Sequence, residues 1–556
     1  MSNALEAASL IMVPSGYENG TLASVKPNDG TGDFTFSRGS NLSATRVGPN
    51  GYIERGYENL LLQSNSFLTT WTQVSILLPT SGQAGYDGST DAWYFEKTGA
   101  FGRLQQSIST SGVRTLSVYL KAKDSSWVSV EASGTNTSRQ YFDLTNISKG
   151  SSNNIISSSI EDAGDGWRKC SITYEGTKTF VFIFIAEGNG QIAGTSGSLY
   201  IQDAMLNQGL VAYPYIETTT APVAGGILED MPRISYHDPS SENGLSDRGH
   251  ILLEPSRTNL AINEYGFSVF SGASISSADV TNPFGDNTDV LEVSYSSFGG
   301  FRLNQNVQVN VGVTYCMGHF MKFNNSEITI SASGAAGSTL SANGSFSFDG
   351  LGNPSKTGDV YFIKYPNGWY YVYGLTTGLL NGSTKVNWMS SAGSILVCKS
   401  QYETNSGGTS ITYPTSYIPT YGVSQTRLQD SCNVSGLAQS FPFTAYIEID
   451  VFSTSVYNQF QFRQDASNHV LRLGNTIRVG TAALSNTNTL GSNKFALSVD
   501  AFGNFELFKN STSLGTGTIT QIIDEIRSDA AGYEVKEIIL FPTALSDEEC
   551  IQLTTV

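Results

Sequence analysis

The sequence repeats itself at a separation of about two hundred residues, and this repeat restricts the folds that the chain can adopt. Five pairs of segments recur in the same order, at separations between 198 and 202 residues. The pairs are TDAWYFEK (90–97) with TDVLEVSY (288–295), FGRLQQSI (101–108) with FRLNQNV (301–307), SVYLKA (117–122) with GHFMKF (318–323), GDGWRKC (164–170) with YPNGWYYV (365–372), and YPYIETT (213–219) with TSYIPTY (415–421). The conserved order and the small drift predict two copies of one folding unit that differ by short loop insertions.

The stretch FTFSRGSNLSATRVGPNGYIERGYENLL (34–61) could be a flexible linker, a catalytic loop or a fixed junction. Its second half also recurs, because GYIERGYENLLLQSNSF (51–67) resembles GHILLEPSRTNLAINEYGF (249–267) and aligns Asn59 with Asn259. A related segment therefore precedes each copy. We interpret it as a lead-in that determines how each module begins.

The pattern inside the copies is that of β-strands. RTLSVYLKA (114–122) alternates apolar and polar residues, as a half-buried strand does. TFVFIFIAEG (179–188) is apolar on both faces, which predicts a central buried strand. Only 14% of the residues are charged, whereas 57 are glycine and 11% are aromatic, a mixture that favours sheets with polar turns over helical bundles. We expect a jelly roll of two packed sheets in each copy.

The residues after 430 have a different strand pattern, and SDEE (546–549) is the capping box of a short terminal helix. The predicted fold class is all-β, with tandem jelly-roll β-sandwiches followed by a third sandwich. The predicted division is an N-terminal segment outside the sandwiches (1–50), module 1 (51–224), a linker or lead-in (225–258), module 2 (259–430) and a C-terminal domain (431–556).

Several of these segments resemble known proteins. FTFSRGSNLSATRVGPNGYIE (34–54) followed by ENLLLQSNSF (58–67) is similar to the signature that leads into the modules of tailed-bacteriophage virion proteins, where carbohydrate-binding-like jelly rolls follow. PRISYHD (232–238) with HILLEPSRTNL (250–260) resembles the second line of that signature, and TSYIPTYGVSQTR (415–427) resembles the ends of such modules. EIILFPTALSDEEC (537–550) looks like the end of a concanavalin A-like, laminin-G-like lectin domain.

This resemblance implies a structural component of a bacteriophage virion, such as a tail fibre, head fibre or other appendage, with lectin-like modules that contact polysaccharides of the host surface. It places the protein in the virion, after synthesis and folding in the host bacterial cytoplasm. Residues 1–50 would attach to other virion proteins, and the chain would be a homo-oligomer, for which the family favours a trimer. No cofactor is expected. Lectin-type jelly rolls often hold a structural calcium ion, which no sequence motif locates here.

Composition excludes two classes of partner. The net charge is −17 and the sequence has no run of lysine or arginine, so we expect no nucleic-acid binding. No stretch approaches the roughly 20 apolar residues that span a bilayer, so we expect no membrane insertion.

Five residues are candidates for carbohydrate binding. Arg103 and Gln106 recur in the second copy as Arg302 and Gln305, and such side chains can form hydrogen bonds with sugar hydroxyls. Trp127 alternates with Val128, so its indole ring would face away from the core and could stack on a sugar ring. The alternative for the Arg–Gln pairs is a structural role inside each module.

No catalytic residues are predicted. The sequence has no G-x-S-x-G motif, and its four histidines lack HxH and HExxH spacing, so they predict no metal site. Two other functions stay open. A purely architectural spacer would bind no ligand, and a glycan-cleaving enzyme would need a pair of carboxylates such as those near Trp167.

Overall fold

The structure is a computed structural model, and the protein is all-β, with tandem jelly-roll sandwiches and a third β-sandwich. The structure describes residues 2–18, 20–39, 42–209, 211–228, 231–262, 266–286, 289–334, 340–341, 343–405, 410–420, 424–452, 460–474, 476–485, 489–528 and 532–556. Within these described ranges, three short helical elements accompany the strands, namely α1 (Ser2–Ala7), η1 (Pro366–Gly368) and α2 (Asp547–Leu553). None of the helices in these ranges is long and apolar enough to cross a membrane.

Module 1 occupies the compact unit Gly56–Gly226 and has two six-stranded antiparallel sheets. In spatial order the first sheet contains β16 (Ser157–Gly164), β17 (Trp167–Tyr174), β12 (Arg114–Ala122), β19 (Ser198–Gln208), β10 (Ala92–Glu96) and β9 (Thr80–Gln83). The second contains β15 (Ser148–Asn153), β14 (Thr137–Asp143), β13 (Trp127–Gly134), β18 (Lys178–Ala186), β11 (Arg103–Thr110) and β8 (Thr72–Val74). The prediction of a central strand is confirmed, because β18 lies between β13 and β11.

Module 2 repeats this topology. Its strands are β24 (Phe267–Ser277), β25 (Leu291–Leu303), β26 (Val307–Val309), β27 (Thr314–Phe323), β28 (Ile328–Gly334), β29 (Leu340–Ser341), β30 (Asn343–Phe348), β31 (Pro354–Gly358), β32 (Val360–Lys364), β33 (Trp369–Gly378), β34 (Gly382–Thr384), β35 (Val386–Ser390) and β36 (Gly393–Asn405). The order β17-β12-β19-β10 recurs as β33-β27-β36-β25, and the order β14-β13-β18-β11 recurs as β30-β28-β35-β25. The two modules are therefore copies of one fold, as the sequence repeat predicts.

One strand distinguishes the copies. β25 pairs with β36 through Leu291–Tyr295 and with β35 through Gly299–Phe301, so it joins both sheets of module 2. In module 1 the same stretch is split into β10 and β11, which lie in different sheets. Gly299 lies where β25 passes between the layers, and a Cβ there would approach the Ala273 nitrogen to 2.5 Å. A side chain at this position would therefore push the strands apart.

The recurring asparagines hold equivalent places in the two modules. Asn59 and Asn259 have no exposed surface, and each side chain spans the last long strand and the exit segment of its module. The partners are Leu61 N, Leu206 N, Ala204 O and Ile216 O for Asn59, and Ala261 N, Tyr402 N and Ile418 O for Asn259, at 2.8–3.2 Å. These bonds explain why the lead-in carries an asparagine in both copies.

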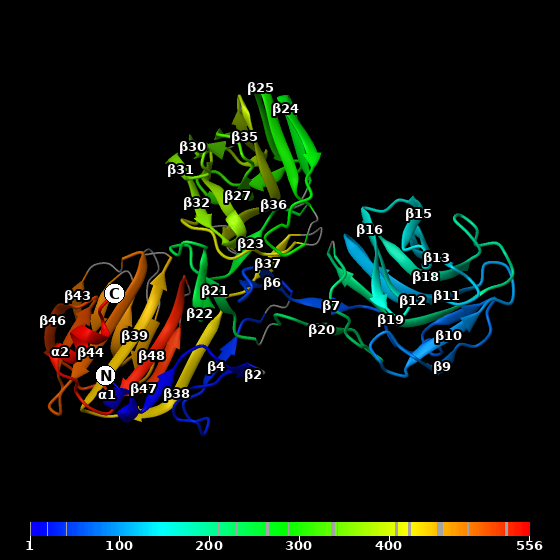
Figure 1. Cartoon of the computed structure of the whole chain (residues 1–556). Coiled ribbons are helices and arrows are strands. Elements are labelled where there is room, and N and C mark those ends of the chain that lie inside the picture. Colours follow the sequence, from blue (N-terminus) through cyan, green and yellow to red (C-terminus); the bar gives the residue numbers. More distant parts are fainter. Residues whose placement is uncertain are drawn as a thin grey trace. The chain divides into compact units, whose positions relative to one another are not determined.

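The third sandwich is assembled from three separate parts of the chain. Its first sheet contains β21 (Ile234–His237), β22 (Leu245–Leu253), β48 (Tyr533–Phe541), β39 (Phe443–Val451), β44 (Gly491–Val499), β45 (Asn504–Lys509) and β46 (Thr512–Thr518), with β1 (Leu10–Met12) also on β48. Its second sheet contains β2 (Tyr17–Glu18), β3 (Thr21–Leu22), β4 (Phe34–Ser37), β38 (Ser431–Gln439), β47 (Ile523–Ser528), β40 (Phe460–Arg463), β41 (His469–Leu473), β42 (Ile477–Val479) and β43 (Ala482–Ser485). Figure 1 shows β4 beside β38, although some 390 residues separate them.

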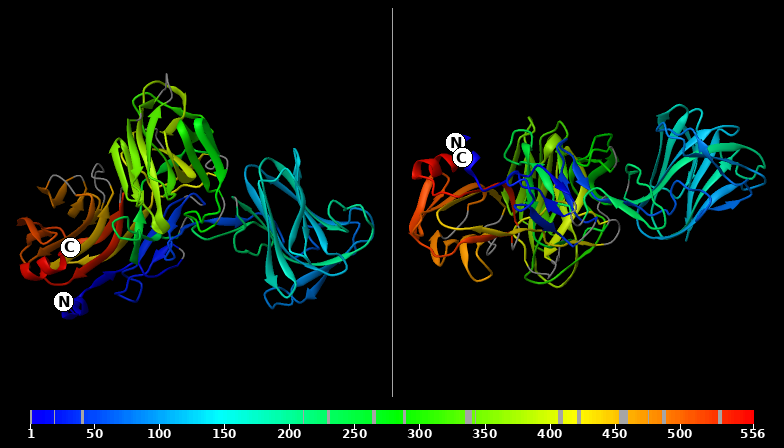
Figure 2. Two further views of the ribbon diagram at one scale, coloured as in Figure 1. Left: turned by 45° about the horizontal axis from the view of Figure 1, so that its top comes forward. Right: turned by 90° about the horizontal axis from the view of Figure 1, so that it is seen from below.

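This arrangement differs from the predicted division of the chain. Residues 1–50 were predicted to be a segment outside the sandwiches, and residues 225–258 a linker or lead-in. In the structure, Leu10, Met12 and Phe36 from the first segment and Ile251 from the second lie in the core between the two sheets. These strands were missed because β1, β3 and β4 have only two to four residues, which is too short for an alternating pattern to be recognised. Both ends of the chain lie beside this sandwich (Figure 2), where Ala8 and Cys550 share a small apolar cluster.

Each module is thus an insertion into the third sandwich along the sequence. The first and last strands of each insertion pair with one another. β7 (Tyr57–Asn59) pairs with β20 (Val223–Gly225) in module 1, and β23 (Arg257–Asn259) pairs with β37 (Gln425–Arg427) in module 2. We call each pair the stem of its module. A hairpin of β5 (Thr45–Val47) and β6 (Ile53–Arg55) precedes the first stem, and its Val47 and Ile53 pack in one apolar cluster with Phe320 and Trp369 of module 2.

The capping box predicted at the C-terminus is confirmed. The Ser546 N–H donates to Glu549 Oε2 at 2.8 Å, and the Glu549 N–H donates to Ser546 Oγ at 3.4 Å.

Candidate functional site

The residues of the recurring signature segments converge on a buried charged joint, which we define as Arg38, Arg233, Glu254, Arg427 and Asp430. Arg233 Nη1 lies 2.8 Å and Arg427 Nη1 lies 3.1 Å from Glu254 Oε2. Asp430 pairs with Arg233 and, at 3.5 Å, with Arg38. None of the five side chains exposes more than 3% of its surface. The joint connects the N-terminal segment, the lead-in of module 2 and the chain that leaves module 2.

The electrostatics of the joint maintain its charges. Burial alone would raise the pKa of Glu254, but Arg427, Arg233 and hydrogen bonds from Ser416 outweigh burial and lower that pKa to about 2. Ser416 donates both its backbone N–H and its hydroxyl to this carboxylate, each at 2.6 Å. A buried ion pair is retained only when such bonds satisfy it. These signature residues therefore have a structural role.

The stem of module 1 carries different residues at the equivalent positions. Tyr57 stands where module 2 has Arg257, and Gly225 stands where it has Arg427. Tyr57 stacks on Tyr213 with ring centroids 4.8 Å apart. The charged joint is thus a property of the module 2 stem, and the stem of module 1 is built from an aromatic pair.

A cavity of about 230 Å³ lies next to the charged joint. Four tyrosines contribute to its lining, together with the carboxylates of Glu254 and Glu534; the tyrosines are Tyr365, Tyr373, Tyr413 and Tyr417. The Glu254 carboxylate already accepts the hydrogen bonds and ion pairs of the joint. The Glu534 carboxylate, by comparison, contacts His250.

Module 1 has a second candidate site on the outer face of the sheet that contains β13 and β18. We call this the aromatic face and define it by its residues: Arg103, Gln105, Trp127, Ser129, Glu131, Arg139, Tyr141, Phe182 and Phe184. Val128, Val130, Val181 and Ile183 point into the core, so the residues that alternate with them point away from it.

The aromatic face forms two rows across the strands. Phe184 lies opposite Arg103 and Ser129, whereas Phe182 lies opposite Gln105 and Glu131. The Arg103 guanidinium lies 5.3 Å and 5.2 Å from the ring centroids of Phe182 and Phe184, which is within the range of a cation–π contact.

The aromatic face contains an ion pair, and a neighbouring serine forms a hydrogen bond with its carboxylate. Arg139 and Glu131 form an ion pair at 2.5 Å, and Ser129 Oγ donates to Glu131 Oε1 at 2.7 Å. Glu131 exposes only 1% of its surface, since the longer side chains of Arg139 and Phe182 lie beside it, while both of these are half-buried. Aromatic rings next to fixed polar groups are the chemistry that binds a sugar ring and its hydroxyls.

The structure separates the five residues predicted for carbohydrate binding. Arg103 and Trp127 share the aromatic face, where Trp127 is half-buried and packs close to Gly150. Gln106 is 3% exposed and points the other way; its amide accepts from the Leu62 N–H and donates to the Leu62 carbonyl, both at 2.8 Å.

The second copy behaves in the same way. Gln305 Nε2 donates to the Leu260 carbonyl at 2.8 Å, and Arg302 lies 5.2 Å above the ring of Phe270. The structural role considered as the alternative describes the contacts of both glutamines. Carbohydrate binding by Arg103, Gln106, Trp127, Arg302 and Gln305 stays a prediction.

Sequence reasoning missed the residues that make the aromatic face distinctive, namely Phe182, Phe184, Arg139 and Tyr141. The signal was present in TFVFIFIAEG, whose phenylalanines occupy every second position from Phe180. It was interpreted only as a mark of burial. In module 2 the equivalent face carries smaller polar residues, among them Thr329, Ser331 and Asn387.

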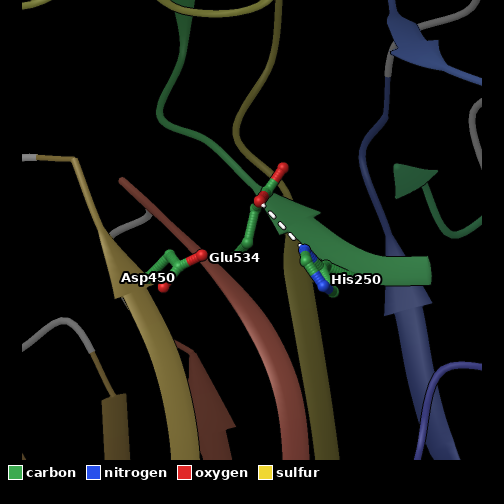
Figure 3. Close-up of side chains that lie close together, drawn as sticks. All are labelled: His250, Asp450 and Glu534. Atoms are coloured by element: carbon green, nitrogen blue, oxygen red, sulfur yellow. Dashed lines mark hydrogen bonds and ion pairs between the residues drawn. The ribbon is translucent and has the colours of Figure 1, made fainter. Parts of the chain in front are cut away.

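A third group lies on the outer face of the third sandwich, where His250, Asp450 and Glu534 come from the neighbouring strands β22, β39 and β48 (Figure 3). Their ligand atoms all lie within 4.8 Å of one another. Burial, with a contribution from Asp450, raises the pKa of Glu534 well above its usual range. Burial also lowers the pKa of His250 to about 4, so the imidazole is neutral at pH 7.

Comparison with known proteins adds little. No family model and no curated protein matches the chain. Among solved structures, the CBM40 of the Ruminococcus gnavus IT-sialidase bound to alpha2,3 sialyllactose is 18% identical, with a TM-score of 0.16 over 20% of this chain and 82% of that chain. The N-terminal CBM22-1-CBM22-2 tandem domain of Paenibacillus barcinonensis Xyn10C is 10% identical, with a TM-score of 0.22 over 66% of this chain and 100% of that chain.

The Trypanosoma rangeli sialidase in complex with sialic acid is 8% identical, with a TM-score of 0.18 over 93% of this chain and 97% of that chain. TM-scores this low carry no argument about fold or function. The fold stated above rests on the strand order, and the function has to be argued from the sites.

Proposed function

We propose that this protein is a non-enzymatic structural component of a bacteriophage virion, a fibre or similar appendage, and that the aromatic face of module 1 binds host-surface polysaccharide. The observation that carries the binding proposal is the arrangement of that face. Two phenylalanine rings, a tyrosine and two arginine side chains gather around the buried carboxylate of Glu131 on one side of a rigid sheet.

The chemistry of the aromatic face fits a sugar better than it fits a protein core. Each guanidinium offers several donors in a fixed plane, and Glu131 holds the plane of Arg139 in place. Phe182 offers a half-buried ring to the apolar face of a pyranose. Single sites of this kind bind weakly, and several copies on one particle would raise the overall affinity.

The virion part of the proposal rests on the signature segments. Their charged residues form the ion pairs of the buried joint, and their asparagines hold the first strand of each module in place. We expect these roles of recurring segments that connect each module to the third sandwich. The same observation favours the second candidate, a purely architectural protein without a ligand.

A glycan array probed with the full chain separates the two candidates. We expect binding to one class of bacterial polysaccharide, with an affinity reduced about 5- to 30-fold by Phe182→Ala or Arg103→Gln, since each change removes about 1–2 kcal/mol of contact. Arg302→Gln is the matched control, because Arg302 is the counterpart of Arg103 in module 2. Wild-type protein that binds no glycan supports the architectural candidate. Equal losses in all three variants would exclude the aromatic face as the site.

Two further experiments test the rest of the proposal. Immunogold electron microscopy of purified phage particles should place the protein on an appendage, and its absence from the particles would refute the virion role. Incubation of the protein with the polysaccharide that it binds should release no new reducing ends. Release of such ends would instead make the protein a glycan-cleaving enzyme.

A further inference from the structure

We propose that His250, Asp450 and Glu534 form a binding site for one divalent transition-metal ion of the Zn²⁺ type on the outer face of the third sandwich. No metal-binding motif of the sequence predicts this site, because the three residues come from strands that lie far apart in the chain. The site is independent of the glycan-binding face of module 1.

The sheet brings the three ligands together on one face. β22, β48 and β39 are consecutive neighbours in the sheet. Asp450 lies directly opposite Glu534, and Leu252 lies opposite Glu534 from the other side, which puts His250 one step along the same face. Figure 3 shows the two carboxylates on adjacent strands and the imidazole turned toward Glu534. A cation between them would join three strands.

Two ionised carboxylates directly opposite each other are stabilised by a positive charge between them. Like charges in a cross-strand pair destabilise a sheet, and here the Glu534 side chain is only 3% exposed. Asp450 Oδ1 is buried and forms no hydrogen bond among the described residues. The oxygen is therefore placed to accept a ligand that the chain itself does not supply.

The histidine has the orientation that a metal ligand needs. Its Nδ1 lies 3.3 Å from Glu534 Oε2, and its Nε2 lies 3.1 Å from Ser246 Oγ. When Nε2 donates its proton to Ser246, the lone pair of Nδ1 faces Glu534. Metal-bound histidines are held in this way by a hydrogen bond from the second ring nitrogen.

Two positively charged side chains, Lys536 and Arg248, lie near the three residues. Lys536 Nζ lies 2.8 Å from Asp450 Oδ2, the oxygen on the other side from the orphaned Oδ1, and 3.8 Å from Glu448. Arg248 pairs with Glu448 at 2.8 Å. Lys536 therefore balances part of the negative charge from the Oδ2 side of Asp450.

The donor set selects the kind of ion. Ca²⁺ and Mg²⁺ prefer oxygen ligands alone, whereas a nitrogen with two carboxylates suits Zn²⁺ and related ions. Tetrahedral Zn²⁺ with ligands about 2.1 Å away needs ligand atoms roughly 3.4 Å apart. The His250–Glu534 pair already has that spacing, and the remaining separations, up to 4.8 Å, require a closure of about 1.5 Å by rotation of Asp450.

The test uses the full chain after removal of metals with EDTA. Isothermal titration with Zn²⁺ should show one ion per chain and raise the melting temperature, and Co²⁺ should give visible absorption bands from nitrogen and oxygen ligands. Asp450→Asn and His250→Gln should each weaken Zn²⁺ binding on the order of 100-fold, since outer-shell changes alone cost 10–100-fold. His469→Gln, in the other sheet of the same sandwich, should leave binding unchanged.

Lys536→Met extends the test, because it frees the second oxygen of Asp450 and should tighten Zn²⁺ binding. If His250→Gln does not fold, Asp450→Asn still decides, since its side chain is 17% exposed and adds no bulk. A wild-type chain that neither binds Zn²⁺ nor gains stability from it overturns the proposal. Equal Zn²⁺ affinity in wild type, Asp450→Asn and His250→Gln overturns it as well.

Discussion

Replacing Asp203 with asparagine tests whether module 1 contains a carboxylate that weakens it at neutral pH. Asp203 is 5% exposed and accepts a hydrogen bond from Tyr86 OH at 2.9 Å. Its pKa is raised to about 7, chiefly by burial and further by Asp91 and Asp87, against the effect of the Tyr86 hydroxyl. Above pH 7 the side chain therefore carries a negative charge that its buried surroundings and the two neighbouring carboxylates disfavour.

The repeat supplies the matching observation in module 2. Asp203 is an extra residue in a bulge of β19, with a φ of 52°, and Lys399 occupies the equivalent bulge of β36, with a φ of 41°. Lys399 Nζ lies 2.9 Å from Asp289, which is the counterpart of Asp91. In module 2 the Lys399 ammonium therefore pairs with the Asp289 carboxylate. In module 1 the equivalent position holds Asp203, whose carboxylate is repelled by that of Asp91.

The expected magnitude follows from linkage. A folded-state pKa of about 7 against an ordinary value of 3.8 means that the folded state binds this proton more tightly than the unfolded chain does. The contribution of this group to the stability of module 1 is then fully present below pH 3.8 and is lost as the pH rises to about 7. Three pKa units correspond to about 4 kcal/mol, and solvent around part of the group reduces this to about 2 kcal/mol.

Asp203→Asn should therefore raise the free energy of unfolding of module 1 by about 2 kcal/mol at pH 8 and change it little at pH 4. Asparagine is nearly the same size and tolerates a positive φ. Urea unfolding of the full chain, followed by hydrogen exchange in peptides from β12 and β19, measures this module separately. Asp165→Asn, at an exposed position with a φ of 49°, controls for the exchange of residue type. An equal effect at both pH values, or a loss of stability at pH 8, would refute the reasoning.

Three other changes test separate parts of the structure. Asn259→Ala should destabilise module 2 by about 3 kcal/mol, because it leaves buried backbone groups unpaired, and Asn59→Ala should do the same to module 1 alone; hydrogen exchange of the two modules distinguishes these outcomes. Glu254→Gln should cost about 4 kcal/mol, because it removes the negative charge that Arg427 and Arg233 share and leaves Asp430 as the carboxylate beside Arg233. Urea unfolding of the third sandwich measures this cost, and a change below about 1 kcal/mol would contradict the joint. The five cysteines are buried, and burial raises the pKa of two of them, Cys432 and Cys550, to about 12, so an aromatic disulfide reagent should react with the chain only after it unfolds.

The sequence predicted the parts of the fold that repeat or alternate. Strand β18 was recognised because every residue from Phe180 to Ala186 is apolar, and the equivalence of Asn59 and Asn259 followed from alignment of the two lead-ins. The C-terminal capping box was recognised from the spacing of Ser546 and Glu549. Each of these signals lies within a few residues of chain or is confirmed by a second copy.

Long-range pairing escaped prediction. A single sequence gives no means of knowing that Phe36 packs with residues beyond position 430, or that Arg233 meets Asp430. Gln106 was proposed as a ligand-binding residue because it recurs, but recurrence also marks a side chain that holds its own backbone, as its bonds to Leu62 show. The metal-site group was missed for the same reason, since its members come from three strands that are joined only in the folded sheet.

The paired stems have a practical consequence. Because β7 lies beside β20, the two ends of module 1 are one inter-strand spacing apart, about 5 Å. A short turn can therefore rejoin the chain after residues 57–225 are excised, and another domain with neighbouring termini can be grafted at the same cut. The architecture makes module 1 an exchangeable cassette, which can be replaced while the rest of the chain keeps its own fold.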